Sequence, residues 1–371
     1  MNQNQNFRKA YVFTSIPNRY GGISNVDKHE IIGKTKIFRF YVPQHKNKLY
    51  RQIISHIFFS IQAIFMSIKY RNKFDFVFAT SSRLGTAILA SSISKILNKK
   101  YAIDIRDIFS DSLKSISFIN TFAGKRIVRF VEILEKKIIK KSSWINFVSA
   151  GFLNYQHINN ENKNVKIYTN GIDQIFIENR RYFIKKKMNG ISFPLIITYA
   201  GNIGYGQSLD KVVVDVAKYF GNRIKFQLIG DGNSISLIKE KVLKSRLSNV
   251  DILNPMKRTD LLNYYNNADI LFFQLNDIPA FENVLPSKIF DYGSFDKPIL
   301  AGVKGEARKF LLENISKPFI YYPNNSNEAI NQINKIILSK KIKINNQKFV
   351  DSYNRRKIMD NMVNSIYDEL K

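Results

Sequence analysis

Residues 281–300 place several groups that could bind an anion within a few positions of one another. Pro286, Ser287 and Lys288 stand directly before a helical pattern, and Asp291 follows one turn later. Proline and serine are typical of helix starts, where unbonded backbone N–H groups attract phosphate. A lysine at the first helical position would add positive charge. A carboxylate about 6 Å further along the axis could accept hydrogen bonds from two ribose hydroxyls.

The same residues also have a purely structural interpretation. Ser287 could act only as the helix N-cap, Asp291 could favour the helix dipole, and Lys288 could be solvated. The prediction of a phosphate and ribose site therefore depends on other segments lying beside this one.

Two glycine-rich turns could supply those segments. The sequence YAGNIGYGQSL (199–209) and the sequence LIGDGN (228–233) each follow a strand pattern. Glycine lets a backbone approach a phosphate closely, although the spacing G-x-x-G-x-G differs from the dinucleotide fingerprint. Because strand ends meet at one edge of a parallel sheet, we expect the three loops to converge. The candidate loop residues are Gly201, Asn202, Gly204, Gln207, Gly230, Asp231 and Gly232.

The elements that must position these loops alternate between strand and helix patterns. Strands are predicted at 193–201, 223–232, 249–253, 269–275, 297–303 and 318–323, and Ser208 is the expected N-cap of a helix over 208–221. The first half shows the same alternation less clearly. Such alternation indicates parallel sheets covered by helices on both faces.

We therefore predict an α/β chain with two Rossmann-like doubly wound domains and a ligand cleft between them. The predicted N-terminal domain spans 1–171, a charge-rich linker spans 172–192, and a second domain spans 193–345. The last helix, 346–371, is expected to pack back on the N-terminal domain. The opening segment leaves little room for a strand, a glycine loop and a helix. Either the first strand–helix unit is missing, or KAYVFTS (9–15) is the first strand, with Gly21 and Gly22 in its loop.

The composition of the chain excludes some kinds of site and of segment. The chain has 371 residues, 44 % hydrophobic residues, no cysteine and a formal net charge of +29. The absence of cysteine excludes disulfides and thiolate metal sites. No signal-peptide pattern is found, and no apolar run of about 18 residues predicts a membrane span.

Most of the excess positive charge falls in residues 1–170, which hold 28 Lys and Arg against 9 Asp and Glu. Such charge attracts nucleic acid, an anionic membrane leaflet or phosphorylated substrates, although a lysine-rich codon bias would give the same excess. Residues 45–73 and 124–142 form basic, apolar helical patterns. We expect them either to associate reversibly with an anionic membrane surface or to pack on the first sheet with solvated basic faces.

Four stretches together resemble a known family. The sequences TYAGNIGYGQSLDKVV, LIGDGN, LLNYYNNADILFF and LPSKIFDYGSFDKPILAG are similar to the donor half of GT-B retaining glycosyltransferases of family 4. They are closest to the N-acetyl-fucosamine-transferase-like branch of O-antigen and capsule assembly. The resemblance covers roughly residues 10–370. It implies a GT-B fold and a metal-independent hexosyltransferase that needs no cofactor besides its nucleotide-diphosphate sugar.

The resemblance also implies roles for individual residues. Asp291 stands where the family has a ribose-binding glutamate, and Glu282 or Asn283 where it has a glutamate that contacts the donor sugar. Arginine and lysine are replaced by Asn202 and Gln207 in the first loop, so Lys288 is expected to take over the phosphates together with Ser287, Gly201 and the amides of 287–290. The remaining implied positions are Met256 and Arg258 in the base pocket and Arg106 and Asp107 on the acceptor side.

The implied reaction transfers a sugar, with retention, to a glycan or lipid-linked acceptor of surface polysaccharide synthesis. The donor phosphate could take the acceptor proton, which agrees with the lack of an evident catalytic histidine. The expected location is cytoplasmic, peripheral on the inner face of the cytoplasmic membrane, with no nucleic-acid partner. The alternatives are a basic nucleic-acid-binding protein and a GT-B epimerase or inactive paralogue.

Overall fold

The computed structural model describes residues 9–16, 26–43, 49–81, 83–114, 121–155, 165–183, 193–339 and 343–370. The chain divides into two compact units. Unit 1 comprises 1–148, 153–168 and 359–371, and unit 2 comprises 149–152 and 169–358. Each unit is described by itself.

Unit 2 contains a six-stranded parallel sheet with the strand order β10-β9-β8-β11-β12-β13. The order reverses between β8 and β11, which makes the unit a doubly wound fold of the kind predicted. The strands are β8 (Leu195–Ala200), β9 (Ile224–Ile229), β10 (Val250–Leu253), β11 (Ile270–Gln274), β12 (Ile299–Gly302) and β13 (Phe319–Tyr321).

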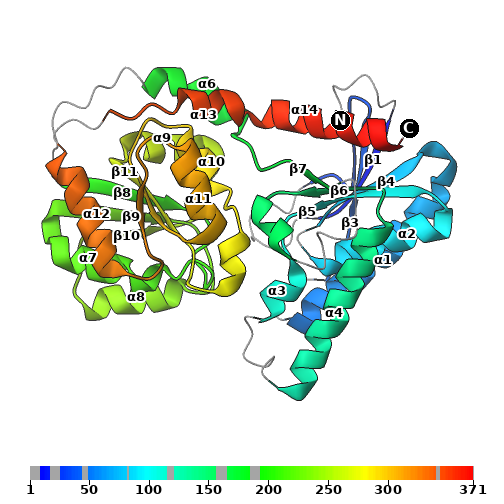
Figure 1. Ribbon diagram of the computed structural model, residues 1–371, viewed down its shortest axis with the longest axis horizontal. Coiled ribbons are helices and arrows are strands. Elements are labelled where there is room, and N and C mark those ends of the chain that lie inside the picture. The colour runs from blue at the N-terminus through cyan, green and yellow to red at the C-terminus, as the bar shows by residue number, and fades with distance from the viewer. Residues whose placement is uncertain are drawn as a thin grey trace. The chain divides into compact units, whose positions relative to one another are not determined.

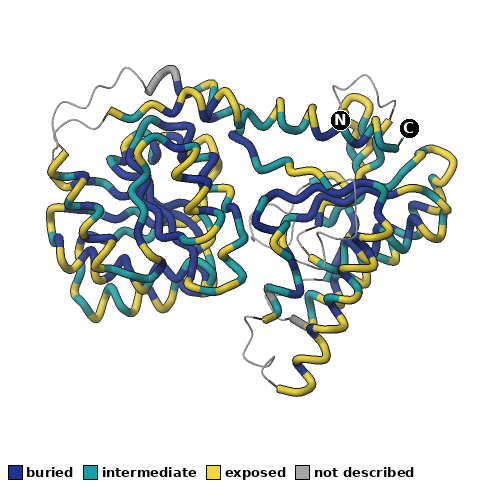
Figure 2. Tube along the Cα trace, in the orientation of Figure 1, coloured by how far each residue is buried: buried dark blue, intermediate teal, exposed yellow. Residues whose placement is uncertain are grey.

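Helices surround this sheet, whose inner strands β8, β9, β11 and β12 are largely buried, whereas the edge strands β10 and β13 are mostly half-buried (Figures 1 and 2). One large core joins the sheet to these helices, and buried aromatic side chains fill much of it. The helical segments are α6 (Gln174–Phe183), η4 (Leu209–Lys211), α7 (Val213–Phe220), η5 (Gly221–Arg223), α8 (Ile235–Lys244), α9 (Arg258–Asn267), η6 (Pro279–Asn283), α10 (Lys288–Gly293), α11 (Gly305–Asn314), α12 (Ser326–Leu338) and α13 (Gln347–Ser352).

Unit 1 distributes its described strands over two sheets. One is the parallel sheet β4-β5-β6-β7, and the other has the order β1-β3-β2, with β1 parallel and β2 antiparallel to β3. The sequence did not predict β2 or the division into two sheets. The strands are β1 (Ala10–Ser15), β2 (His29–Ile32), β3 (Thr35–Phe40), β4 (Phe76–Ser81), β5 (Lys100–Ile105), β6 (Trp144–Phe147) and β7 (Val165–Ile167).

Helices lie on both faces of the β4–β7 sheet (Figure 1). Helix α2 packs on β4 and β5 and contacts both α1 and α4, whereas α14 contributes to a separate cluster on the same strands. The helical segments are α1 (Leu49–Lys69), η1 (Arg71–Lys73), α2 (Leu84–Leu97), α3 (Phe109–Lys114) and α4 (Phe122–Lys141), while η3 (Ala150–Asn154) and α14 (Arg355–Leu370) cross the unit boundary.

The C-terminal helix α14 completes the core of unit 1. Met362 and Ile366 pack with Ala102 and Trp144, and the Trp144 indole donates a hydrogen bond of 3.0 Å to the Ser365 hydroxyl. Trp144 is the chain's one tryptophan and is fully buried. Its fluorescence therefore reports on this contact directly.

We expect Ile366→Ala to lower the free energy of unfolding of unit 1 by about 2–5 kcal/mol, because it leaves a cavity beside Trp144. Urea unfolding followed by Trp144 fluorescence measures this change. Asp368→Ala, at an exposed position of the same helix, serves as the control. Equal midpoints for the two variants would contradict the docking of α14.

Two local predictions were wrong. Ser208 makes no side-chain cap: its backbone is left-handed (φ 48°), it precedes the short segment η4, and α7 begins only at Val213. The sequence predicted no apolar stretch long enough to cross a membrane, whereas helix α1 is long and apolar enough by length and composition alone. The segment predicted as a linker, 172–192, contains helix α6. The glycines at 21 and 22, considered for a first loop, lie outside the described residues.

Candidate functional site

The strand order of unit 2 brings the predicted loops together. The loop after β8 starts at Gly201, and the loop after β9 starts at Gly230, at the carboxyl ends of adjacent strands. The segment from Leu275 to Asn283 follows β11 on the other side of the switch point. Ligands of doubly wound sheets bind at this edge.

The two glycine turns are hydrogen-bonded to each other. Gly201 N–H donates to the Ile229 carbonyl and Ile203 N–H to the Asp231 carbonyl, both at 2.8 Å. A Cβ on Gly230 would lie 1.8 Å from the Gly201 carbonyl oxygen, so only glycine fits there. Both Gly201 and Gly230 have positive φ, 146° and 149°. The glycines therefore serve a close approach between backbones.

Two polar side chains that the sequence analysis missed hold the first loop in place. The buried Gln274 amide donates to the carbonyls of Gln207 (3.0 Å) and Ser208 (2.9 Å). Asn276 donates to the Tyr205 carbonyl at 3.0 Å. Gln274 is the last residue of the apolar strand ILFFQ, and Asn276 follows two positions later. Polar residues at the end of an apolar strand are the signal that could have identified both.

Within the loop, Gln207 and Asn202 contact each other rather than pointing apart. The Asn202 amide donates to Gln207 Oε1 at 2.7 Å, and Gly204 N–H donates to the same oxygen at 3.3 Å. The Asp231 carboxylate caps its own turn by accepting from Gly232 N–H at 2.8 Å. The first loop, 201–209, is thus closed by the neutral groups of Asn202, Gly204 and Gln207. A cation that binds a diphosphate must therefore come from another segment.

The side chain of Lys288 places a cation beside the start of the first loop. Its Nζ lies 5.0 Å from the centroid of the Tyr199 ring, and a Cβ on Gly201 would come within 2.4 Å of it. Among the described residues the ammonium forms no ion pair. Burial lowers the pKa of Lys288 to about 8, against the opposing effect of Asp291. A lysine kept in such an environment would gain from an anionic ligand.

The start of α10 differs from the expected helix tip. Ser287 has helical backbone angles and makes no side-chain cap, which corrects its assignment as N-cap. The amides of Ile289 and Phe290 donate to the carbonyls of Pro286 (3.2 Å) and Ser287 (3.1 Å). They are therefore engaged in the turn. Because the amides of 289 and 290 are already hydrogen-bonded, the Lys288 side chain is the main group at this helix start that can bind an anion.

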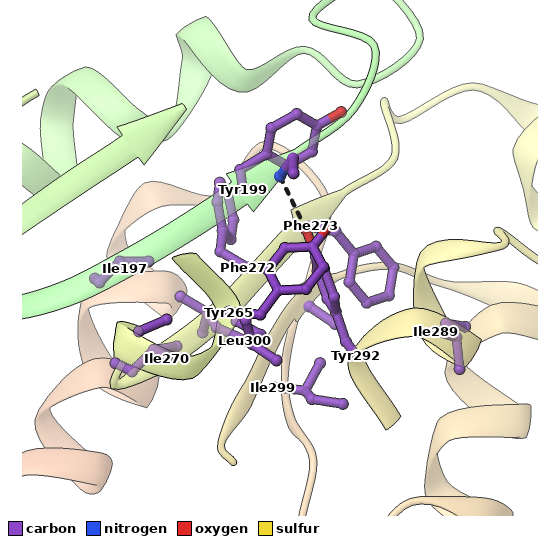
Figure 3. Packing of buried hydrophobic residues seen from close by; sticks show 14 of the residues in the cluster. Ile197, Tyr199, Tyr265, Ile270, Phe272, Phe273, Ile289, Tyr292, Ile299 and Leu300 are labelled. Carbon is purple, nitrogen blue, oxygen red and sulfur yellow. Dashed lines mark hydrogen bonds between the residues drawn. The ribbon is translucent and has the colours of Figure 1, made fainter. Parts of the chain in front are cut away.

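Buried tyrosines fix α10 to the end of β8. The Tyr292 hydroxyl accepts a hydrogen bond of 3.1 Å from Ala200 N–H (dashed line in Figure 3), and Tyr265 packs edge-on against Tyr292. The Tyr199 hydroxyl donates to the Asn202 carbonyl. These contacts hold the segment that carries Lys288 next to the loop that contains Gly201 and Asn202.

Asp291 belongs to a cluster of charged groups. Its Oδ1 lies 3.8 Å from the Arg258 guanidinium, which also pairs with Asp173. Asp173 in turn lies 3.0 Å from Arg355. Burial raises the pKa of Asp291, although Arg258, Arg355 and Lys288 oppose this change. Met256, the other residue predicted for a base pocket, packs partly buried against the core.

Glu282 and Asn283 are held by contacts of their own. Lys304, which the sequence analysis missed, bridges Asp277 (2.7 Å) and Glu282 (2.9 Å). The hydrogen bonds to these carboxylates raise the pKa of Lys304. The Asn283 carbonyl accepts a hydrogen bond of 2.6 Å from the Ser149 hydroxyl. The Glu282 carboxylate is thus oriented by a cation, as a hydroxyl-binding group would be.

In unit 1, Arg106 and Asp107 follow β5. The Arg106 guanidinium lies 3.0 Å from the buried Asp104 and donates to the Thr80 hydroxyl, also at 3.0 Å. Asp104 also accepts from Asn146 at 2.7 Å. Desolvation raises the pKa of Asp107 to about 6, against the attraction of Arg106. Since Asp107 keeps an exposed surface, water screens part of this effect.

No group of three or more potential metal ligands occurs among the described residues. His56, on α1, stacks against Phe59 and covers Gly85.

Several solved structures share the fold of this chain. Sucrose-phosphate synthase from Thermosynechococcus elongatus superposes with a TM-score of 0.72 at 12 % identity, covering 97 % of this chain and 88 % of the other. Anabaena HepE, solved with UDP and glucose, gives 0.63 at 14 % identity, covering 89 % and 85 %. The apo lipopolysaccharide outer core galactosyltransferase WaaB gives 0.58 at 13 %, covering 98 % and 100 %.

No protein-family model matches the chain, and no curated protein matches its sequence. The likeness therefore concerns architecture, with parallel α/β sheets in both units and a doubly wound order in unit 2. On these grounds, the fold of the chain is GT-B, as the sequence motifs predict.

Proposed function

We propose that the chain is a glycosyltransferase that takes a sugar from a nucleotide-diphosphate donor bound to unit 2. The observation that carries the proposal is the ammonium of Lys288, which lies against the Gly201 backbone at the switch point of the sheet. A diphosphate is the anion that suits a partly buried cation beside two closely packed glycine turns.

The other predicted residues of unit 2 complete the proposed donor site. Asp291 would accept hydrogen bonds from the ribose, with Arg258 holding its carboxylate. Glu282, oriented by Lys304, and Asn283 would contact the donor sugar. Gly201, Asn202 and Ser287 would line the phosphates, with Gly204, Gln207, Gly230, Asp231 and Gly232 shaping the loops and Met256 contacting the base.

The proposed chemistry needs no metal and no enzyme base. The acceptor hydroxyl would attack the anomeric carbon on the face from which the diphosphate leaves, so that the glycosidic bond forms as the bond to the diphosphate breaks and the configuration is retained. An oxygen of the leaving diphosphate would take the hydroxyl proton, and the Lys288 ammonium would stabilise the diphosphate. Arg106 and Asp107 would contact the acceptor. UDP appears in the HepE complex and supports a nucleotide-sugar donor for this fold. The Lys288 position and the neutral first loop support the family 4, N-acetyl-fucosamine-transferase-like branch.

We place the enzyme, as part of the same proposal, in surface polysaccharide synthesis with a lipid-linked acceptor. The likeness to WaaB, a lipopolysaccharide outer core galactosyltransferase, supports this class of product. The location would be the cytoplasmic face of the membrane, with reversible attachment through the basic unit 1.

The test is a thermal-shift screen of the full chain against UDP-, GDP- and ADP-sugars, followed by product analysis with a labelled donor. We expect one nucleotide series to stabilise the chain. We also expect the label to move to a lipid or glycan acceptor. Stabilisation with no transfer to any acceptor would favour an inactive paralogue. No stabilisation by any nucleotide sugar would overturn the proposed function.

A further inference from the structure

Helix α1 exposes a row of large apolar side chains, while Phe59, Ile64 and Met66 pack half-buried against the core of unit 1. Ser55, Ala63 and Ser67 are the buried positions of the helix, whereas Ile61 and Phe65 are 64 % and 66 % exposed. The exposed apolar residues recur every three or four positions and therefore form one stripe along the whole helix. They are Tyr50, Ile53, Ile54, Ile57, Phe58, Ile61, Phe65 and Ile68.

The opposite face of α1 is fixed to the protein. The Gln62 amide donates to the Tyr41 carbonyl at 2.9 Å, and the Ser55 hydroxyl donates to the Pro43 carbonyl. The helix also packs on α2 and β1. Lipid therefore cannot surround α1 while unit 1 stays folded. Its length and composition permit a membrane span, but its packing restricts it to lying along a surface.

Helix α4 adds positive charge next to α2, the helix that α1 also contacts. Its exposed residues include both apolar and basic types, and Arg126 stacks over the Phe122 ring at 4.4 Å. Exposed positions, yellow in Figure 2, recur along this helix. Its exposed large apolar and basic residues are Phe122, Lys125, Arg126, Ile127, Arg129, Phe130, Ile133, Lys136, Lys137, Lys140 and Lys141.

We propose that unit 1 inserts the exposed stripe of α1 into the headgroup region of an anionic bilayer, with the basic residues of α4 binding the lipid headgroups. An aliphatic and aromatic stripe about 30 Å long, accompanied by cations, matches a helix that lies in the plane of a membrane interface. The proposal deepens the membrane attachment proposed above by assigning it to named residues of α1 and α4, and it rests on the transferase function only for its purpose, access to a lipid-linked acceptor.

Flotation of the full chain with vesicles tests the attachment. We expect binding to vesicles of phosphatidylcholine with a quarter phosphatidylglycerol, and much weaker binding to phosphatidylcholine alone. Replacing Ile61 and Phe65 by serine together should lower the partition coefficient at least about tenfold. The matched control replaces Leu243 and Leu338, which are 79 % and 78 % exposed in unit 2, by serine. It should bind as the unmodified chain does.

A Phe65→Trp variant separates insertion from surface attraction. Its emission should shift to the blue with anionic vesicles and be quenched by brominated acyl chains, whereas buried Trp144 contributes a constant background. Unchanged flotation of the double serine variant would overturn the proposal. So would a change from dimer to monomer in that variant without vesicles, since the stripe would then join two copies. Nucleotide-sugar thermal shifts of the same variants, expected unchanged, test the donor site separately.

Discussion

Gly230→Ala is expected to abolish nucleotide-sugar binding and to lower the free energy of unfolding of unit 2 by several kcal/mol, or to prevent its folding. A Cβ at this position would lie 1.8 Å from the Gly201 carbonyl oxygen. The obstacle is backbone, which cannot rotate away as a side chain could. Separating the two turns would also break the hydrogen bond from Gly201 N–H to the Ile229 carbonyl. The backbone at Gly230 has φ 149°, which is unfavourable for alanine in any case.

Gly221→Ala provides the matched control. Gly221 also has positive φ, 53°, but a Cβ there meets no atom within 4 Å. Because its ψ is −134°, its replacement costs backbone strain alone, about 1–3 kcal/mol, without a collision with another part of the backbone. Urea unfolding and thermal shift with the nucleotide sugar found in the screen measure both variants. If Gly230→Ala behaves like Gly221→Ala, the close packing of the two turns does not exist in solution.

Lys288→Met is expected to weaken nucleotide-sugar affinity by about 10- to 100-fold while leaving the free chain as stable as before or more so. Methionine fills much of the same volume beside Tyr199 without a charge, and a charge-assisted contact to a phosphate is worth about 1.5–3 kcal/mol. Because no ion pair forms at the ammonium in the described chain, its removal leaves no carboxylate without a partner. Isothermal titration with the donor and urea unfolding give the two quantities.

The pH dependence of the same variant makes the assignment specific. The pKa of Lys288 is lowered to about 8 from its ordinary value of 10.5. The unfolded chain therefore binds more protons than the folded one between about pH 8 and 10.5, so stability rises with pH in this window. Lys288→Met should lack this rise. Donor affinity of the unmodified chain should fall above about pH 8. Equal donor affinities of the two proteins at pH 7 would count against Lys288 as the phosphate ligand.

The sequence was sufficient to predict the strands of unit 2 because their apolar runs are long and bounded by clear turns. It failed where long-range contacts decide local structure. Helix α6 is held by Phe176, which packs against Tyr265 and Phe295 from distant segments. Ser208 adopts a left-handed conformation while Gln274 binds its carbonyl. Neither contact is visible in a local window of sequence.

The sequence located the segments that form the candidate site, but it did not predict the contacts between them. Turn residues identified the Gly201 and Gly230 loops, because glycine at strand ends has few other uses. The hydrogen bond from Ala200 N–H to the Tyr292 hydroxyl holds α10 at the end of β8, and it joins segments about 90 residues apart. Lys304 was missed because its partners, Asp277 and Glu282, precede it by more than 20 positions.

The discontinuous make-up of unit 1 bears on the order in which the protein matures on the ribosome. Nearly all of unit 2 is a continuous segment, 169–358, whereas unit 1 takes residues 359–370 from beyond it. Trp144 receives its cover from Met362 and Ile366 only after more than 200 further residues have been translated. The later half of the chain can thus reach its native state before the earlier half does. Until then, the apolar surface around Ala102 and Trp144 that α14 covers stays exposed on the nascent unit 1.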